Sequence, residues 1–349
     1  MNPQPAQPQP ATQAAASCPV TPDLSHLLTT GSGPSRTATN RPLGIGGSDI
    51  GAVLGLSPYR SAVDVWADLV GRVPRETHDA VHLRFGQHAE SFVAAEYERA
   101  TGRSLVECPQ TLFHPEHGFM FAHVDRLVLE RAGDTALEDG RVTAPGVLEC
   151  KTANAFAAHG WGEPGSDRVP AAYLAQCAWY TAVTGCAWAD LAVLIGNSDF
   201  RVYRLARDPE LEALVLGRAK AFWYENVLAQ RPPAARTASD AATLFPRSAP
   251  GSQVEATAEV LEALQGYRAR QAQLQALTEE SESLKARVLA HMGEAEALSH
   301  AGRTLATWRS ARASQRLDTR SLEAEQPELA ARYRVSVAGS RRFLLRDGA

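Results

Sequence analysis

The sequence has few cysteines and no apolar run long enough to span a membrane. The cysteines are odd in number, and no two of them form a CxxC pair, which argues against a disulfide framework and against a zinc knuckle. A membrane-spanning helix needs about 20 consecutive apolar residues. The first residues also lack the basic stretch followed by an apolar run that is typical of a signal peptide. We therefore expect a soluble, cytoplasmic protein with no membrane partner.

Strong net charge is also absent, since the 349 residues carry a formal charge of −4. This excludes a histone-like polycation, although a local basic patch on an acidic protein remains compatible with nucleic-acid binding. Residues 301–349 contain 10 Arg against 5 Asp and Glu. A basic tail on an acidic body indicates a polyanionic partner, and a solvated surface explains the same count equally well.

Composition divides the chain into four parts. Residues 1–40 are rich in Pro, Gln, Ala, Ser and Thr, which predicts a disordered tail. Residues 41–230 have the patterning of a folded domain, and residues 231–252 contain four prolines, which predicts a linker. Residues 253–349 are expected to form a long helical arm, over about 253–292, and a small basic α+β region. A near-heptad apolar stripe on the arm predicts packing on its own domain or a coiled-coil dimer.

The folded part mixes helical and strand patterns. A Gly-rich turn at 44–47 leads into a helix for which Ser48 or Asp49 is the expected N-cap. Helical patterns follow at 62–70, 81–100, 170–184 and 208–229, and strand patterns at 111–113, 119–129, 146–152, 191–195 and 200–205. We predict an α/β domain with a central mixed sheet of four or five strands flanked by helices.

The strand at 146–152 carries two opposite charges, Glu149 and Lys151. Alternate side chains of a strand share a face, so these two point the same way. Burying an unpaired charge is costly, and an ion pair on an edge strand is the ordinary explanation of such a pattern.

A second acid, Asp125, ends the apolar run 119–124, where strand propensity disfavours it. By itself it is expected to cap a bulge. Together with Glu149 it suggests a different role, because two carboxylates on neighbouring strands can hold a hard divalent cation. Lys151 beside them can stabilise charge on a phosphate or position an attacking water. The combination indicates metal-dependent phosphodiester hydrolysis.

Three further residues are candidates on two helices. Glu90 follows Gly86 by four positions, and Gly86 would clear space on the same helix face. Gln176 and Tyr180 are also four residues apart and share a face. Each has an ordinary explanation, a solvent-facing Glu in the first case and an amphipathic helix in the second.

The order GxxxE, D, ExK, QxxxY resembles the PD-(D/E)xK nuclease superfamily, in its branch with the RecB-type QxxxY motif. The stretch GGSDIGAVLGLSPY at 46–59 is similar to the start of YqaJ-type viral recombinases, which are relatives of lambda exonuclease. The resemblance covers residues 42–230 and implies a restriction-endonuclease-like core. Val124 stands where the superfamily has its name-giving Pro, which leaves the acidic residues unaffected.

The resemblance implies roles position by position. Asp125 and Glu149 would ligate Mg²⁺ or Mn²⁺ together with the Cys150 carbonyl, and Glu90 would bind a second metal or its water. Lys151 would assist in activating water, and Gln176 and Tyr180 would support the site and the DNA strand. DNA contacts are expected from Ser48, from the backbone of Gly47 and from Arg41.

The implied activity is Mg²⁺-dependent exonucleolytic resection of linear duplex DNA ends, 5′→3′, with a single-strand annealing protein as partner in phage-type recombination. Three alternatives stay open. The same site would serve an endonuclease or structure-specific nuclease, or the domain could be a non-catalytic DNA-end-binding module. A coiled-coil assembly protein would account for residues 253–292 alone. The sequence leaves polarity and homo-oligomerisation undecided.

Overall fold

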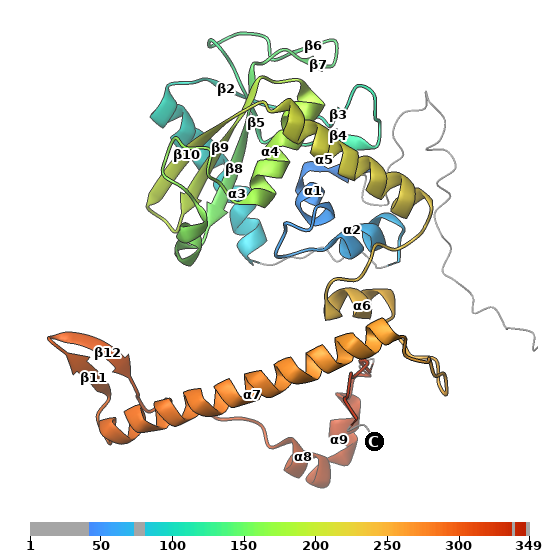
Figure 1. Ribbon diagram of the computed structural model, residues 1–349. Coiled ribbons are helices and arrows are strands. Elements are labelled where there is room, and N and C mark those ends of the chain that lie inside the picture. The colour runs from blue at the N-terminus through green and yellow to red at the C-terminus, as the bar shows by residue number, and fades with distance from the viewer. Residues whose placement is uncertain (1–41, 73–80, 337–338, 347–349) are drawn as a thin grey trace, which may run out of the picture. The chain divides into compact units, whose positions relative to one another are not determined.

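A computed structural model describes residues 42–72, 81–336 and 339–346 (Figure 1). The tail at 1–40, predicted to be disordered, and Arg41 lie outside the described residues. The chain divides into two compact units, with the boundary between Pro246 and Arg247. No helix of the described part is both long and apolar enough to cross a membrane.

The centre of unit 1 is a five-stranded mixed sheet in the order β10-β9-β8-β5-β2. Strands β8 and β9 pair in parallel and the other neighbours antiparallel, which confirms the predicted mixed sheet. Strand β9 is almost entirely apolar, as expected of a strand covered on both faces. The strands are β2 (Leu105–Glu107), β5 (Arg126–Val128), β8 (Gly146–Ala153), β9 (Trp188–Ile195) and β10 (Asp199–Ala206).

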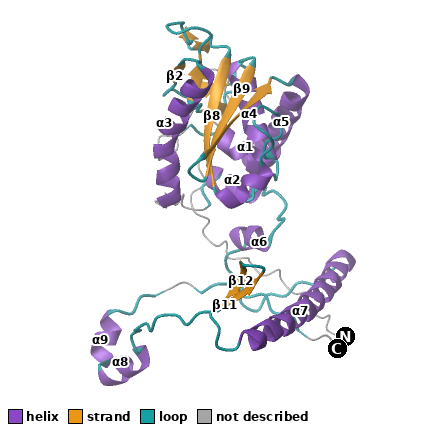
Figure 2. Cartoon of the chain, turned by 90° about the vertical axis from the view of Figure 1, so that its left-hand side faces the viewer, coloured by secondary structure: helices purple, strands orange, loops and turns teal. Residues whose placement is uncertain are grey.

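Helices cover both faces of this sheet (Figure 2). On one face α3 packs Val93 and Tyr97 against Leu148 and Cys150 of β8. On the other face α4 packs Cys177 and its neighbours onto the same strands. The helices are α1 (Gly47–Val53), α2 (Ala62–Leu69), α3 (Val81–Thr101), α4 (Ala171–Thr184) and α5 (Pro209–Ala221), which continues as a π-helix over Phe222–Leu228.

The apolar run at 119–129 forms two strands, so the single predicted strand is wrong. Strand β4 (Met120–Ala122) belongs to a small separate sheet with β1 (Ile45–Gly46) and β3 (Leu112–Phe113), whereas β5 joins the central sheet. The chain changes sheet over residues 123–125, and Asp125 lies immediately before β5. A run of buried residues on both sides of the change conceals it from pattern analysis.

The Gly-rich turn leads into α1 as predicted, but its N-cap is Gly46 rather than Ser48 or Asp49. Asp49 is the third helical residue, and its carboxylate accepts from the Gly46 N–H at 3.1 Å. Arg60 reaches both Asp49, at 3.0 Å, and Asp68 of α2, at 2.5 Å. These contacts fix the turn against α2.

The segment predicted as a linker, 231–252, is folded over part of its length. Helix α6 (Ala238–Leu244) begins at a capping box between Thr237 and Asp240 and packs on α2. Leu244 belongs to the main apolar core, and Asp240 is buried. Residues up to Pro246 therefore belong to unit 1.

Unit 2 contains the long helix α7 (Ala258–Met292), the hairpin β11 (Ala297–His300) and β12 (Arg303–Thr307), and the short helices α8 (Thr319–Glu325) and α9 (Pro327–Arg332). The long helix begins five residues later than predicted, after its N-cap Thr257. Its apolar stripe is exposed, including Leu274, Leu277 and Leu284. A further hairpin in unit 1 joins β6 (Leu137–Glu138) to β7 (Arg141–Val142).

Candidate active site

Asp125 lies immediately before β5 and opposite Glu149 of the neighbouring strand β8. Arg126 pairs with Leu148 in the antiparallel β5–β8 ladder, which places Asp125 at the level of Glu149. The Cys150 N–H donates to Asp125 Oδ2 at 2.7 Å. The change of sheet before β5 thus frees Asp125 from the ladder and turns its carboxylate toward the β8 backbone.

Glu149 is 3% exposed, and its two oxygens have different surroundings. Oε1 pairs with the Lys151 ammonium and also accepts from Gln176 Nε2 at 2.7 Å. Oε2 is buried and has no hydrogen-bond partner among the residues that the structure describes. A buried carboxylate oxygen without a partner is energetically costly, which is a reason to expect a ligand there.

Lys151 points to the same side of β8 as Glu149, as strand alternation predicted. Its ammonium lies 5.2 Å from the centre of the Tyr173 ring. Burial alone lowers the pKa of Lys151, but the charge and hydrogen bond of Glu149 outweigh it, so the pKa is raised above its ordinary value. Lys151 therefore stays protonated and positively charged at neutral pH.

Gln176 and Tyr180 share one face of α4, as their spacing predicted, and this face meets the site. Gln176 Nε2 donates to Tyr180 Oη at 2.8 Å as well as to Glu149. Tyr180 in turn lies against Gly47, where an added Cβ would come within 2.4 Å of the ring. Helix α1 is therefore linked to Glu149 through two side chains of α4.

Glu90 of α3 interacts electrostatically with Glu149 and Lys151. Burial first, and then the charge of Glu149, raise the pKa of Glu90. The same two causes raise the pKa of Asp125 to about 8. Three carboxyl groups with one ammonium favour the binding of a further positive charge. A Cβ at Gly86 would meet no atom within 4 Å, so the close approach predicted there is not seen.

The three predicted DNA contacts differ in placement. Ser48 is exposed at the start of α1. Gly47 is buried and serves the contact with Tyr180. Arg41 lies outside the described residues.

Two further residues of this site belong to none of the sequence motifs. Tyr173 precedes Gln176 by almost one helical turn, and its ring lies beside the Lys151 ammonium. Arg126 contributes positive charge that lowers the pKa of Glu90, and its guanidinium donates to the Asp125 carbonyl at 2.6 Å. Its place directly after Asp125 was the available signal.

The donors present fit a hard divalent cation. Asp125 and Glu149 offer carboxylate oxygens, and the Cys150 carbonyl points to the Asp125 side of β8, because the N–H of the same residue does. No three side chains of Asp, Glu, His or Cys in the described ranges form a complete metal cage. Mg²⁺ commonly takes one or two protein carboxylates and completes its shell with water and phosphate oxygens. The unpartnered Oε2 of Glu149 is consistent with such an ion.

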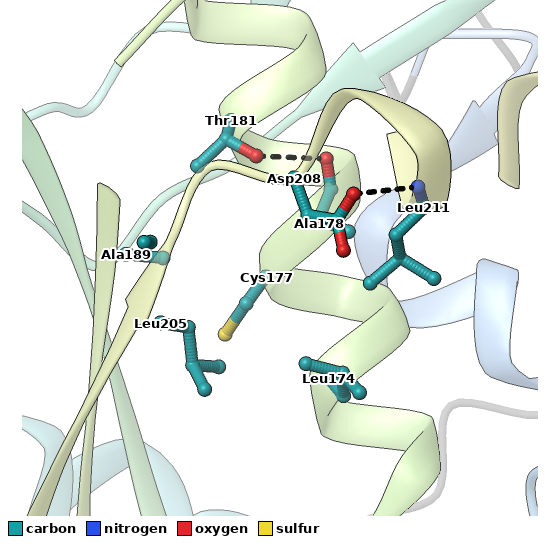
Figure 3. Close-up of a pocket in the computed structure, with 9 residues that line it drawn as sticks. Leu174, Cys177, Ala178, Thr181, Ala189, Leu205, Asp208 and Leu211 are labelled. Carbon is teal, nitrogen blue, oxygen red and sulfur yellow. Dashed lines mark hydrogen bonds between the residues drawn. The ribbon is translucent and has the colours of Figure 1, made fainter. Parts of the chain in front are cut away.

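A separate small cavity lies between α4, the β9–β10 hairpin and the start of α5 (Figure 3). It encloses about 20 Å³ and is lined mainly by apolar side chains such as Leu174 and Leu205. Nearby, the Thr181 hydroxyl donates to the Ala178 carbonyl, and Asp208 accepts from the Leu211 N–H. This volume suits one water molecule and no nucleotide.

Fold and site together define an α/β domain with carboxylates and a lysine gathered at the break between two sheets. Residues 38–187 match the model of the YqaJ-like viral recombinase domain, so this part of the chain is similar to that family. The chain is also 29% identical over 295 residues to the protein YqaJ of Bacillus subtilis (strain 168). The matched region covers 83% of this chain and 87% of that protein.

Two solved structures show a weaker likeness. The alkaline exonuclease LHK-Exo of Laribacter hongkongensis is 22% identical with a TM-score of 0.41, covering 54% of this chain and 90% of that one. A phage related exonuclease from Haemophilus somnus 129PT is 14% identical with a TM-score of 0.37, covering 54% and 96%. Scores at this level carry no functional argument, which depends instead on the residues of this chain.

Proposed function

We propose that this protein is a metal-dependent deoxyribonuclease of a phage-type recombination system. It hydrolyses phosphodiester bonds of linear duplex DNA from the ends, in the 5′→3′ direction, and leaves a single strand for an annealing protein. The observation that carries the proposal is the convergence of Asp125, Glu149 and Lys151 in a YqaJ-like domain, with Glu149 Oε2 buried and unpartnered. Such a site belongs to the PD-(D/E)xK type.

In the proposed mechanism, Asp125, Glu149 and the Cys150 carbonyl hold Mg²⁺ or Mn²⁺, and Glu90 binds a second ion or its water. When bound, the metal supplies Lewis-acid stabilisation of the phosphate and a water of lowered pKa. Lys151 holds its proton and places a positive charge where the phosphate gains negative charge in the transition state. Gln176 fixes the orientation of Glu149 through the 2.7 Å hydrogen bond to Oε1.

We propose contacts with the DNA backbone from residues at and just before the start of α1. Ser48 is exposed and presents a hydroxyl group at the start of α1, next to Gly47 and Tyr180. Arg41 is proposed as a further phosphate contact on the strength of its place in the sequence. These groups would position the strand rather than recognise bases.

The test is a cleavage assay on one linear duplex labelled at each end in turn. It compares 5′-phosphate with 5′-hydroxyl ends, includes a closed circle, and uses Mg²⁺ against EDTA. We expect metal-dependent loss of linear DNA from the 5′ end, with the circle intact, and no cleavage by Lys151→Ala. Cutting of the circle would instead indicate an endonuclease. End binding without cleavage in Mg²⁺ or Mn²⁺ would indicate a non-catalytic binding module.

A further inference from the structure

Unit 2 contains a stretch with no acidic side chain. Between residues 297 and 317 there is no Asp or Glu, whereas four arginines occur, at 303, 309, 312 and 316. We call residues 303–316 the arginine segment. Arginine stays charged at all accessible pH values and offers planar, bidentate donors that match phosphate.

These arginines are exposed and mostly without an acidic partner. Arg303, Arg312 and Arg316 form no ion pair within the described residues. Arg309 lies 3.5 Å from Glu296, but both side chains are more than half exposed, and such a pair contributes little. The segment therefore presents four available cations to solvent.

Part of the backbone of the segment is already engaged, because residues 303–307 pair with β11 and the Trp308 N–H donates to the Glu296 carbonyl. Beyond β12, residues 308–318 form neither helix nor strand. Their backbone N–H groups, and the side chains of Ser310, Ser314 and Gln315, are of the kinds that bind DNA phosphates alongside Arg. Fully extended, the stretch from 309 to 316 spans up to about 25 Å, over which duplex DNA carries a charge every ~1.7 Å.

We infer that the arginine segment binds the phosphate backbone of DNA, independently of base sequence and in addition to the site in unit 1. The choice of DNA as the polyanion rests on the proposed function. An acidic protein is the less suitable partner, because residues 309–316 contain only Arg, Ser, Ala and Gln. Within 309–316 there is no aromatic or large aliphatic side chain for the apolar centre of a protein interface; the exposed Leu305, Trp308 and Leu317 lie on either side of this stretch.

Salt-dependent binding tests the inference directly. Fluorescence anisotropy of a labelled 30-base-pair duplex is measured with the full chain in EDTA, between 50 and 200 mM KCl. The variant combines Arg309→Gln, Arg312→Gln and Arg316→Gln. Each lost phosphate contact reduces the slope of log K against log salt by about 0.9. We expect a slope lower by about 2 to 3 and an affinity at least tenfold weaker at 100 mM KCl.

A matched control removes three exposed arginines elsewhere in unit 2, through Arg270→Gln, Arg287→Gln and Arg320→Gln. We expect this control to keep the wild-type slope. If the slope fell equally in both variants, the effect would be due to net charge alone, and the inference would be overturned. A wild-type slope in the arginine-segment variant would also overturn the inference. So would a loss of affinity confined to one duplex when the measurement is repeated with a second duplex of different base sequence.

The experiment separates this inference from the proposed function, because EDTA prevents metal-dependent cleavage during binding. A reduced slope in a protein that never cleaves DNA in Mg²⁺ or Mn²⁺ would support the arginine segment and overturn the nuclease. Normal cleavage with an unchanged slope would overturn the arginine segment alone.

Discussion

Tyr180 lies against the backbone of Gly47, with its ring where a side chain at Gly47 would otherwise be. The hydroxyl of the same tyrosine accepts from Gln176, which holds Glu149. The start of α1 and the acidic site are therefore in mechanical contact, although more than 100 residues separate them in the sequence.

Substituting Gly47→Ala should disturb both the fold and the site. The new Cβ would lie 2.4 Å from Tyr180 Cε1, so the ring must move and weaken its bond to Gln176. Overpacking of this kind destabilises by about 1 to 3 kcal/mol. Urea unfolding and cleavage rate measure the two effects. Gly217→Ala in α5 is the control, since a Cβ added at Gly217 meets no atom within 4 Å. Wild-type cleavage by Gly47→Ala would contradict the proposed link.

The stability of the metal-free protein should depend on Asp125. Burial and Glu149 raise its folded pKa from 3.8 to about 8. The folded state therefore binds this proton more tightly than the unfolded state, and the stability that it contributes is lost as pH rises through 8. In EDTA, Asp125→Asn should have a higher Tm than the wild type, by a margin that grows from pH 5 to pH 9.

Scanning fluorimetry at several pH values checks this expectation, with the exposed Asp167→Asn as control. Mg²⁺ should raise the wild-type Tm more at pH 8.5 than at pH 6, because metal and protons compete for the same carboxylates. A Tm difference that is constant with pH would show that Asp125 is not the titrating group.

Tyr173 is expected to position Lys151. Loss of a partly desolvated cation–π contact costs about 1 to 2 kcal/mol, which corresponds to a rate lower by about 5- to 30-fold. Tyr173→Leu should therefore lower kcat in Mg²⁺, whereas Tyr173→Phe keeps the ring and should cleave nearly as fast as the wild type. If the phenylalanine variant were as slow as the leucine variant, the hydroxyl rather than the ring would be the important group.

A buried cluster away from the site gives a contrasting expectation. Tyr97 Oη donates to Asp190 at 2.5 Å, and Arg204 makes two further bonds to the same carboxylate. Tyr97→Phe removes one hydrogen bond to a buried charge and should lower the free energy of unfolding by about 1 to 3 kcal/mol. Calorimetry measures the loss, and the cleavage rate at 25 °C should stay within twofold of the wild type.

The sequence predicted much of this arrangement because its signals are local. Strand alternation placed Glu149 and Lys151 on one side of β8, and helical spacing placed Gln176 and Tyr180 on one face of α4. The bond from Gln176 to Glu149 could not be derived in this way, since it depends on how α4 lies across the sheet. The contact between the Tyr173 ring and the Lys151 ammonium could not be derived for the same reason.

Errors arose where buried chain changes direction without Gly or Pro. The run at 119–129 is apolar on both sides of residues 123–125, and Asp125 in its middle indicated a bulge rather than a change of sheet. At 231–252 the opposite occurred, because four prolines indicated a linker although Thr237 and Asp240 form a capping box within it.

Helix α6 has a practical consequence for dividing the protein. A fragment ended at residue 230, where the prolines begin, would remove Leu244 from the core and take Arg236 away from Gly55. Its α2 would be left with a bare apolar surface, and aggregation on expression would be the expected symptom. A fragment ended at residue 246 keeps that covering intact, and it is the shorter piece in which the acidic site should be studied by itself.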